Sequence, residues 1–312
     1  MVVSYLYTEH AVSPDAPEPG VPATQQPREH TLATTLLGWD FELQIGFSRR
    51  FAFEALVPVR VSMINAGFRD ASGNPLPLAT SIHHRDETLV GFGDVVLDGR
   101  IGIVLPEQVP TWHLDLRLGW TVPTGHTEAD PFARGDRGLS HQHNFFGSGT
   151  VDPIVGLESN VIRPKLAVTT WSTARVPAYR NHFGYRHSRS VAGGVGVLTR
   201  FGLRRWTFLA QPEVFFETPA RWPGREAPNS GRLSLIATAG VFARPHPTVQ
   251  LHTLIKVPYY TKAHGGALRW PLIAIVGATV AFDLRPRDAA PPSSSPQRRV
   301  RPTTLQGGSR PE

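Results

Sequence analysis

The links between the strand-like segments of this 312-residue chain alternate in length between short and long. Short links follow the even-numbered segments: Arg49–Arg50, then "LPEQVP", "RPK", "GLRR" and "PHP". Long polar links follow the odd-numbered segments and cover 10–29, 67–85, 124–149, 180–188, 219–230 and 262–270. Transmembrane β-barrels are built in this way, with short periplasmic turns at one end and long outer loops at the other. Nothing in the architecture of a soluble β-sandwich or β-propeller requires short and long loops to alternate along the chain.

The segments themselves alternate residue by residue, as β-strands do. The clearest example is Thr111–Val122, whose apolar positions are Trp112, Leu114, Leu116, Leu118, Trp120 and Val122. A helix would scatter these side chains around its circumference, because its faces repeat every 3.6 residues. We therefore predict twelve strands: 1–9, 30–48, 51–66, 86–104, 111–123, 150–162, 165–179, 189–202, 205–218, 231–244, 247–261 and 271–284.

Charged and polar side chains recur at mid-strand on the face opposite the apolar one. A soluble sheet with one wet face explains each strand singly, but it does not explain this recurrence. In a membrane barrel the apolar face meets lipid and the polar face lines the lumen. We expect the following side chains to point into the lumen: Glu42, Gln44, Glu54, Arg60, Asp94, Asp98, Arg100, His113, Asp115, Arg117, Asp152, Glu158, Gln211, Glu213, His252 and Lys256.

Composition agrees with an all-β chain and excludes several other classes. The chain has 29 glycines and 29 prolines, which suits many turns, and no cysteine, so disulfides and thiolate metal sites are absent. No stretch approaches the roughly 20 apolar residues that a spanning helix requires. The net charge is +7, yet six of the arginines lie beyond residue 284, and the remaining charge forms no basic stripe. We therefore expect no nucleic-acid partner.

The two ends of the chain lead to expectations about export and assembly. No secretory signal precedes the first segment, "MVVSYLYTE", and a membrane barrel must be exported, so we expect either that the true start lies upstream or that this sequence is the mature form. The last strand, "IVGATVAF", resembles the terminal signal that the barrel assembly machinery reads, with Phe282 at its end. Residues 1–284 are therefore predicted to form the barrel, and residues 285–312 a disordered tail rich in Pro, Ser and Arg.

Three stretches resemble a known family: "GFGDVVLDGRIGIV", "LDLRLGWTVPTG" and "GSGTVDPIVGLESN". They are similar to the bacterial outer-membrane proteins of the meta-pathway of phenol degradation family, which share a G-x-G-D strand, a strand ending in P-T-G and a following G-T-G-S-x-D. The matching residues here are Gly91, Gly93 and Asp94, then Pro123, Thr124 and Gly125, then Gly147, Ser148, Gly149 and Asp152. Ser and Thr are exchanged in the third stretch. The resemblance implies an outer-membrane β-barrel that transports small molecules, including aromatic or apolar compounds.

Catalytic and cofactor motifs are absent from the sequence. It contains no G-x-S-x-G elbow, no H-E-x-x-H and no phosphate-binding or dinucleotide fingerprint, so we expect no enzyme activity and no cofactor. Histidines do cluster on the long loops, and imidazole is a common transition-metal ligand. The sharpest clusters define a candidate metal site at His83, His84, His141 and His143. Solvated loops also collect polar residues, so both interpretations stay open.

The sequence thus predicts a closed antiparallel barrel of about twelve strands in the bacterial outer membrane, with lipid, a small solute and the assembly machinery as partners. The leading hypothesis for its function is a passive channel or transporter for small molecules. The alternative is a non-conducting barrel whose histidine-bearing loops bind a metal or a partner. Asp98 and Arg100 on one strand, with Asp115 and Arg117 on the next, are expected to form a charge network. That network is either a static brace or a solute-selecting ring.

Overall fold

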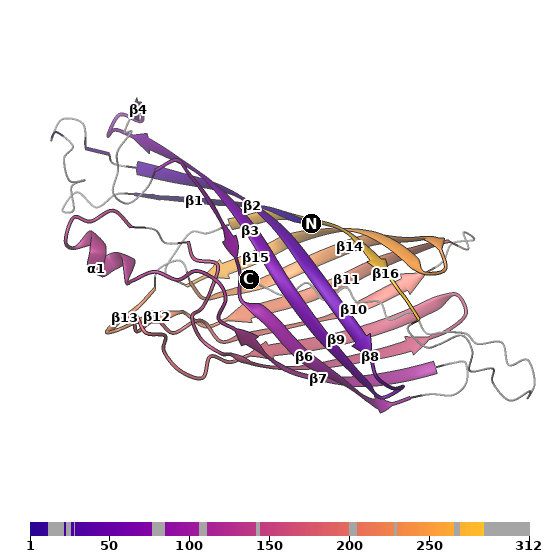
Figure 1. Ribbon diagram of the computed structural model, residues 1–312. Coiled ribbons are helices and arrows are strands. Elements are labelled where there is room, and N and C mark those ends of the chain that lie inside the picture. The colour runs from indigo at the N-terminus through magenta and orange to yellow at the C-terminus, as the bar shows by residue number, and fades with distance from the viewer. Residues whose placement is uncertain are drawn as a thin grey trace, which may run out of the picture.

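Twelve antiparallel segments, here called staves, close into a single barrel (Figure 1). Eleven staves are single strands, and one consists of the two successive strands β5 and β6. The computed structural model describes residues 1–11, 22, 26–27, 29–76, 85–105, 111–141, 144–199, 205–227, 230–264 and 269–283. The staves are β1 (Val2–Ala11), β2 (Glu29–Gly46), β3 (Phe51–Arg69), β5 with β6 (Glu87–Phe92 and Val95–Val104), β7 (Thr111–Val122), β8 (Pro153–Ile162), β9 (Leu166–Arg175), β10 (Ser190–Thr199), β11 (Trp206–Glu217), β14 (Arg232–His246), β15 (Val249–Ala263) and β16 (Arg269–Val280).

The ring closes through β1, which pairs with β2 on one side and with β16 on the other. Each remaining stave pairs with its sequence neighbours, and β2–β3 completes the circle. This is the predicted all-β barrel. The predicted tail, 285–312, lies outside the described residues.

Short strands and one short helix lie at the end of the barrel that carries the long loops (Figure 1). They are β4 (Pro75–Leu76), the short helix α1 (Pro131–Gly135), and the two-stranded hairpin of β12 (Arg221–Trp222) and β13 (Arg225–Glu226). Asp130 caps α1 by accepting hydrogen bonds from Phe132 N and Ala133 N. None of the helical segments in the described ranges is long and apolar enough to span a bilayer.

At the opposite end, the predicted short links that lie within the described residues are tight turns. Between β2 and β3, the Ser48 hydroxyl accepts hydrogen bonds from the backbone N–H groups of Arg50 and Phe51, both at 3.1 Å. Between β14 and β15, His246 and Thr248 hydrogen bond to each other at 2.8 Å. Such short connections fix the register of neighbouring strands.

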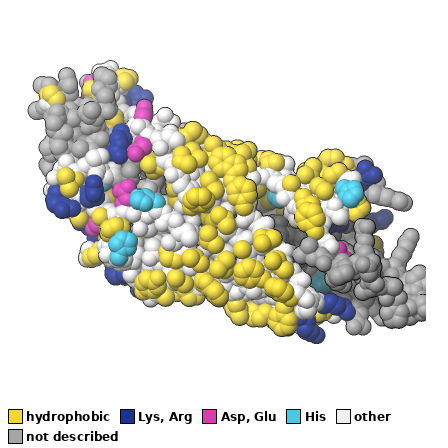
Figure 2. All heavy atoms as spheres, viewed as in Figure 1, with side chains coloured by type: hydrophobic (Ala, Val, Ile, Leu, Met, Phe, Trp, Pro, Cys, Tyr) yellow, Lys and Arg dark blue, Asp and Glu magenta, His cyan; other side chains and the backbone are white. Residues whose placement is uncertain are grey.

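The two faces of the barrel wall have opposite character. Large apolar side chains on the outer face remain exposed, with Trp112 at 48% and Trp120 at 50%. Figure 2 shows these apolar side chains covering the middle of the molecule, while charged side chains gather toward its ends. The inner face buries polar groups instead, including Ser62, Asp98 and Thr238. A membrane barrel requires this inverted arrangement, since lipid surrounds it and its backbone is paired within the wall.

One stave differs from the continuous strand predicted over 86–104. The stave is split into β5 and β6, and Gly93 and Asp94 lie between the two parts. β3 pairs with β5 through Val59–Ile64 and with β6 through Phe51–Leu56. Pro58 of β3 lies opposite the interruption, where its carbonyl accepts a hydrogen bond from Gly93 N at 3.0 Å. The interruption frees the Asp94 side chain to interact with loops rather than with the next strand.

Candidate functional site

A charge network crosses the inner wall from β3 to β8. Arg117 of β7 pairs with Glu54 of β3 at 2.5 Å and with Asp98 of β6 at 2.9 Å. Arg100 of β6 pairs with Asp115 of β7 at 2.8 Å and with Glu158 of β8 at 3.3 Å. Arg100 and Arg117 lie directly opposite each other in the β6–β7 ladder, so the carboxylates around them offset a like-charge pair.

A second polar cluster occupies the wall formed by β11, β14 and β15. The Glu213 carboxylate accepts hydrogen bonds from Lys256 Nζ at 2.7 Å, from Gln211 Nε2 at 2.9 Å and from the Thr238 hydroxyl. All four residues are buried. Between this cluster and the end with the short turns, the inner face is apolar. The side chains packed together there are Leu198, Leu209, Phe242, Leu254 and Ile275.

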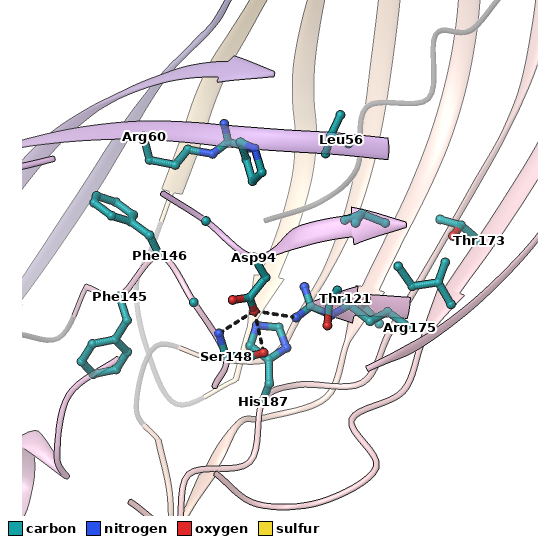
Figure 3. A pocket seen from close by; sticks show the side chains of 16 residues that line it. Leu56, Arg60, Asp94, Thr121, Phe145, Phe146, Ser148, Thr173, Arg175 and His187 are labelled. Carbon is teal, nitrogen blue, oxygen red and sulfur yellow. Dashed lines mark hydrogen bonds and ion pairs between the residues drawn. The ribbon is translucent and has the colours of Figure 1, made fainter. Parts of the chain in front are cut away.

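Near the loop end, the three short motifs of the sequence meet at Asp94 (Figure 3). Its carboxylate accepts hydrogen bonds from Gly125 N at 3.1 Å, from Ser148 N at 2.8 Å and from the Ser148 hydroxyl at 2.7 Å. Thr124 Oγ1 donates to the Gly93 carbonyl at 2.9 Å. The motifs are far apart in sequence, and their convergence gives the chemical reason for these residue types.

Two glycines allow the two stems of the β7–β8 loop to touch. A Cβ added to Gly125 would lie 2.5 Å from Gly147 Cα, and one added to Gly147 would lie 2.5 Å from the Gly125 carbonyl carbon. Since no real side chain tolerates such contacts, only glycine fits at either position. Gly149 has a positive φ of 69°, which also favours glycine.

A second anchor holds the same loop at the start of β8. Asp152 is fully buried and pairs with Arg175 of β9 at 2.6 Å, while the Thr150 hydroxyl donates to its other oxygen at 2.5 Å. Asp152 N donates to Thr121 Oγ1 at 2.9 Å. Asn181, from the β9–β10 loop, adds a hydrogen bond to the Ser148 carbonyl at 3.1 Å.

Aromatic side chains from three loops pack above these anchors. The ring centroid of Tyr185 lies 6.2 Å from that of Phe145 and 4.8 Å from that of Trp222. Arg225 of the outer hairpin lies over the Phe132 ring of α1 and 3.5 Å from Asp136. The described loop segments therefore pack against one another over the lumen.

The loops and the inner wall line a partly open cavity of about 160 Å³. Its apolar lining includes Phe145 and Phe146 from the β7–β8 loop, and its polar lining includes Asp94, Arg175 and His187 (Figure 3). The remaining lining residues are Leu56, Pro58, Arg60, Gly93, Val96, Thr121, Gly147, Ser148, Ile154, Thr173 and Ser190. Arg60 pairs with Asp40 at 2.8 Å, and Arg175 with Asp152.

His187 is a half-buried member of this lining. Its Nδ1 lies 3.0 Å from the Ser188 carbonyl, the geometry of a hydrogen bond donated by the ring. Desolvation and, to a smaller extent, the nearby Arg175 guanidinium lower the pKa of His187 from its ordinary value near 6.5 to about 4, against the opposing effect of Asp152. At neutral pH the imidazole is therefore uncharged.

This lowered pKa makes the loop cluster sensitive to acid. A histidine whose pKa is lower in the folded state contributes stability that is lost as the pH falls from about 6.5 toward 4. We expect amide hydrogen exchange in residues 176–189 to speed up over this pH range, after correction for intrinsic rates. A His187→Asn variant keeps a donor near the Ser188 carbonyl and should show no such pH dependence. Equal pH dependence in the two proteins would contradict this assignment.

The other residues predicted to line the lumen are distributed along the inner face. Gln44 donates to Glu54 at 2.6 Å, and Glu42 lies on the same face of β2 as Gln44. His113 is half-buried on β7 near Asp115. His252 packs against Phe242, and its ring occupies the space where a Cβ of Gly277 would lie. Whether any of these side chains contacts a solute stays a prediction.

Of the predicted metal ligands, only His141 is described. It is buried, and its Nδ1 lies 2.9 Å from the Leu139 carbonyl. His83, His84 and His143 lie outside the described residues. Across the described ranges, no group of three or more His, Cys, Asp or Glu side chains is arranged to hold a metal. The metal site therefore remains a prediction.

Sequence reasoning missed Arg175, Thr121 and His187. Arg175 lies at the end of the predicted strand 165–179, on the same face as Thr169 and Thr173, so strand parity alone would have placed it inside. Thr121 likewise shares the polar face of β7 with Asp115 and Arg117. His187 lies on a loop, where no periodic signal exists.

Comparison with known proteins identifies the fold class of the chain. No protein-family model matches the chain, and no curated protein matches it. Among solved structures, it is similar to the COG4313 outer membrane channel from Pseudomonas putida F1, with 11% sequence identity, a TM-score of 0.56, and coverage of 90% of this chain and 95% of that chain. The chain has the fold of an outer-membrane barrel.

Two other outer-membrane barrels show weaker similarity. The toluene transporter TodX of Pseudomonas putida is 10% identical with a TM-score of 0.39, covering 90% of this chain and 78% of that one. A FadL homologue of Pseudomonas aeruginosa is 10% identical with a TM-score of 0.38, covering 89% and 87%. Since no family model matches, the resemblance to the meta-pathway of phenol degradation family stays a prediction.

Proposed function

We propose that this outer-membrane barrel is a passive channel or transporter for small molecules, including aromatic or apolar compounds. The observation that carries the proposal is the 160 Å³ cavity between the β7–β8 loop and the inner wall. Phe145 and Phe146 provide apolar surface there, and the charged groups around them are engaged in ion pairs or hydrogen bonds. Binding sites for small molecules are commonly apolar cavities with a few placed polar groups.

The fold supports the same proposal in a coarser way. A solved relative in fold is described as an outer membrane channel. The proposed location is the outer membrane of a bacterium, with the apolar belt of Figure 2 in contact with lipid. The small solute is the proposed ligand, and the barrel assembly machinery the proposed partner during biogenesis.

A non-conducting barrel is the second candidate function, and a specific observation favours it. The β7–β8 loop reaches into the lumen at Phe146 and Ser148 and narrows the interior near the loop end. In that case the histidine-bearing loops would bind a metal or a partner on the outer surface.

Single-channel recording in planar bilayers separates the two candidates. For a channel we expect discrete current steps from the purified protein, which must shift its mobility on gels after heating as folded barrels do. We also expect uptake of a small aromatic alcohol into liposomes that contain the protein, with protein-free liposomes as the control. If a correctly folded barrel gives no current steps and no uptake, that result contradicts the channel and favours the non-conducting candidate.

A further inference from the structure

Asp94 is tied to both stems of the β7–β8 loop at once. One carboxylate oxygen accepts from Gly125 N, in the stem that leaves β7. The other accepts from Ser148 N and Oγ, in the stem that enters β8, and it lies 3.7 Å from the Arg175 guanidinium. Asp94 and Ser148 are both buried, so water competes little for these hydrogen bonds.

The wall is shaped to present this carboxylate. Asp94 follows Gly93 in the interruption between β5 and β6, where a Cβ on Gly93 would lie 2.9 Å from the Pro58 ring. The carbonyl of Gly93 accepts from Thr124, and its N–H donates to Pro58, so its backbone groups are both used. Gly93, the residue directly before Asp94, is therefore fixed by Pro58 of the wall on one side and by Thr124 of the first loop stem on the other.

The loop segment Asn144–Thr150, here called the inner segment, depends on Asp94 in turn. Phe146 packs against the inner face of β5, with its ring 3.0 Å from where a Gly91 Cβ would lie. Ser148 N and Oγ both point at Asp94, and the donor Asn181 lies on another loop. Charge-assisted hydrogen bonds are about twice as strong as neutral ones. Asp94 accepts two of them from Ser148 in the middle of the segment, and Asp152 accepts one from Thr150 at its end.

We infer that Asp94 is a latch, a positioning residue that holds the inner segment against the wall and so sets access to the cavity. With the latch closed, Phe146 and Ser148 line one side of the cavity. With the latch broken, the inner segment leaves the wall and exposes the cavity lining. This inference rests on the proposed function, because access matters only if a solute enters the lumen.

The absence of cysteine from the chain allows a direct test by thiol labelling. Val96→Cys is the reporter, because Val96 lies on rigid β6, is 6% exposed and lines the cavity with the inner segment. We expect a membrane-impermeant maleimide to label this reporter on the order of 10- to 100-fold faster when Asp94→Ala is added, since two or more charge-assisted hydrogen bonds are lost. Asp94→Asn keeps one acceptor and should show a smaller increase.

Two controls separate the latch from general loosening. Leu254→Cys, in the apolar cluster at the other end of the lumen, should label at the same rate with and without Asp94→Ala. Arg225→Ala removes a loop contact to Asp136 that does not touch the latch, and it should leave Val96→Cys labelling unchanged. If Asp94→Ala accelerates both reporters, or neither, the latch is wrong.

Conductance gives the second readout and keeps the two proposals apart. We expect Asp94→Ala to raise the open time of single channels several-fold over the unmodified protein. Faster Val96→Cys labelling without conductance in any variant would support the latch and overturn the channel. Normal conductance with unchanged labelling would overturn the latch and leave the channel standing. If Asp94→Ala fails to fold, Ser148→Ala removes one of the hydrogen bonds and should give a smaller effect in the same direction.

Discussion

An Arg117→Glu variant should lose on the order of 3–5 kcal/mol of unfolding free energy, as when a buried ion pair is broken. Arg117 is paired with Glu54 and Asp98, whose side chains are only 3% and 1% exposed. The substitution would leave these two carboxylates without their guanidinium partner and place a third carboxylate beside them. We expect the urea midpoint for unfolding from detergent micelles to fall sharply, and some of the protein to fail to fold.

The matched control is a reversal of charge at an exposed position. Arg163 lies on the short turn between β8 and β9, so Arg163→Glu should leave the midpoint almost unchanged. The Arg117→Glu variant also decides between the two roles of the charge network, when its unfolding midpoint is compared with its ion preference in planar bilayers. A stability loss with unchanged ion preference identifies a brace. A stable barrel whose reversal potential shifts toward cations identifies a selecting ring and contradicts our expectation.

A Glu213→Leu variant should be similarly destabilised, by roughly 3 kcal/mol, because it removes the carboxylate that is ion-paired with a buried lysine. Lys256 is 4% exposed and lies 2.7 Å from Glu213, and the Gln211 amide and Thr238 hydroxyl donate to the same carboxylate. Leucine offers no acceptor to any of these three donors. Unfolding in urea, followed by intrinsic fluorescence, measures the effect.

An exposed carboxylate provides the comparison for this cluster. Glu226 pairs with Arg221 on the outer hairpin, where both side chains are largely exposed. Glu226→Gln should produce no measurable change in the unfolding midpoint, because exposed ion pairs contribute little. If Glu213→Leu were as stable as Glu226→Gln, the hydrogen bonds and the ion pair of Glu213 would contribute nothing measurable, and the cluster would not be a structural anchor.

Most of the wall could be predicted because strand parity is a local signal. The alternation over Thr111–Val122 places Trp112 and Trp120 outside and Asp115 and Arg117 inside, and no other part of the chain is needed to see it. The alternation of short and long links also predicted which staves are neighbours, because a short link can join only two adjacent antiparallel strands. The predicted boundaries were wrong by several residues where loops take over, as at residues 150–152 and 176–179.

The candidate site was harder to predict because its contacts join distant parts of the chain. The ties of Asp94 span 31 residues to Gly125 and 54 to Ser148, and no periodicity connects them. Asp94 was predicted to line the lumen, but its role as an anchor for loop stems depends on the break between β5 and β6. That break arises where β3 presents Pro58, and it is a property of the paired strands rather than of either sequence alone.

The position of β1 between β2 and β16 has a consequence for how the molecule is made. Val2 pairs with Ile275, so the first stave to leave the ribosome cannot complete its pairing until the last one arrives. Folding slows as contacting residues lie further apart in sequence, and unpaired strand edges invite aggregation in the meantime. Any partly formed sheet of this chain therefore keeps two open edges until β1 and β16 meet. Pairing of β1 with β16 is therefore the step that converts an open sheet with two free edges into a closed barrel.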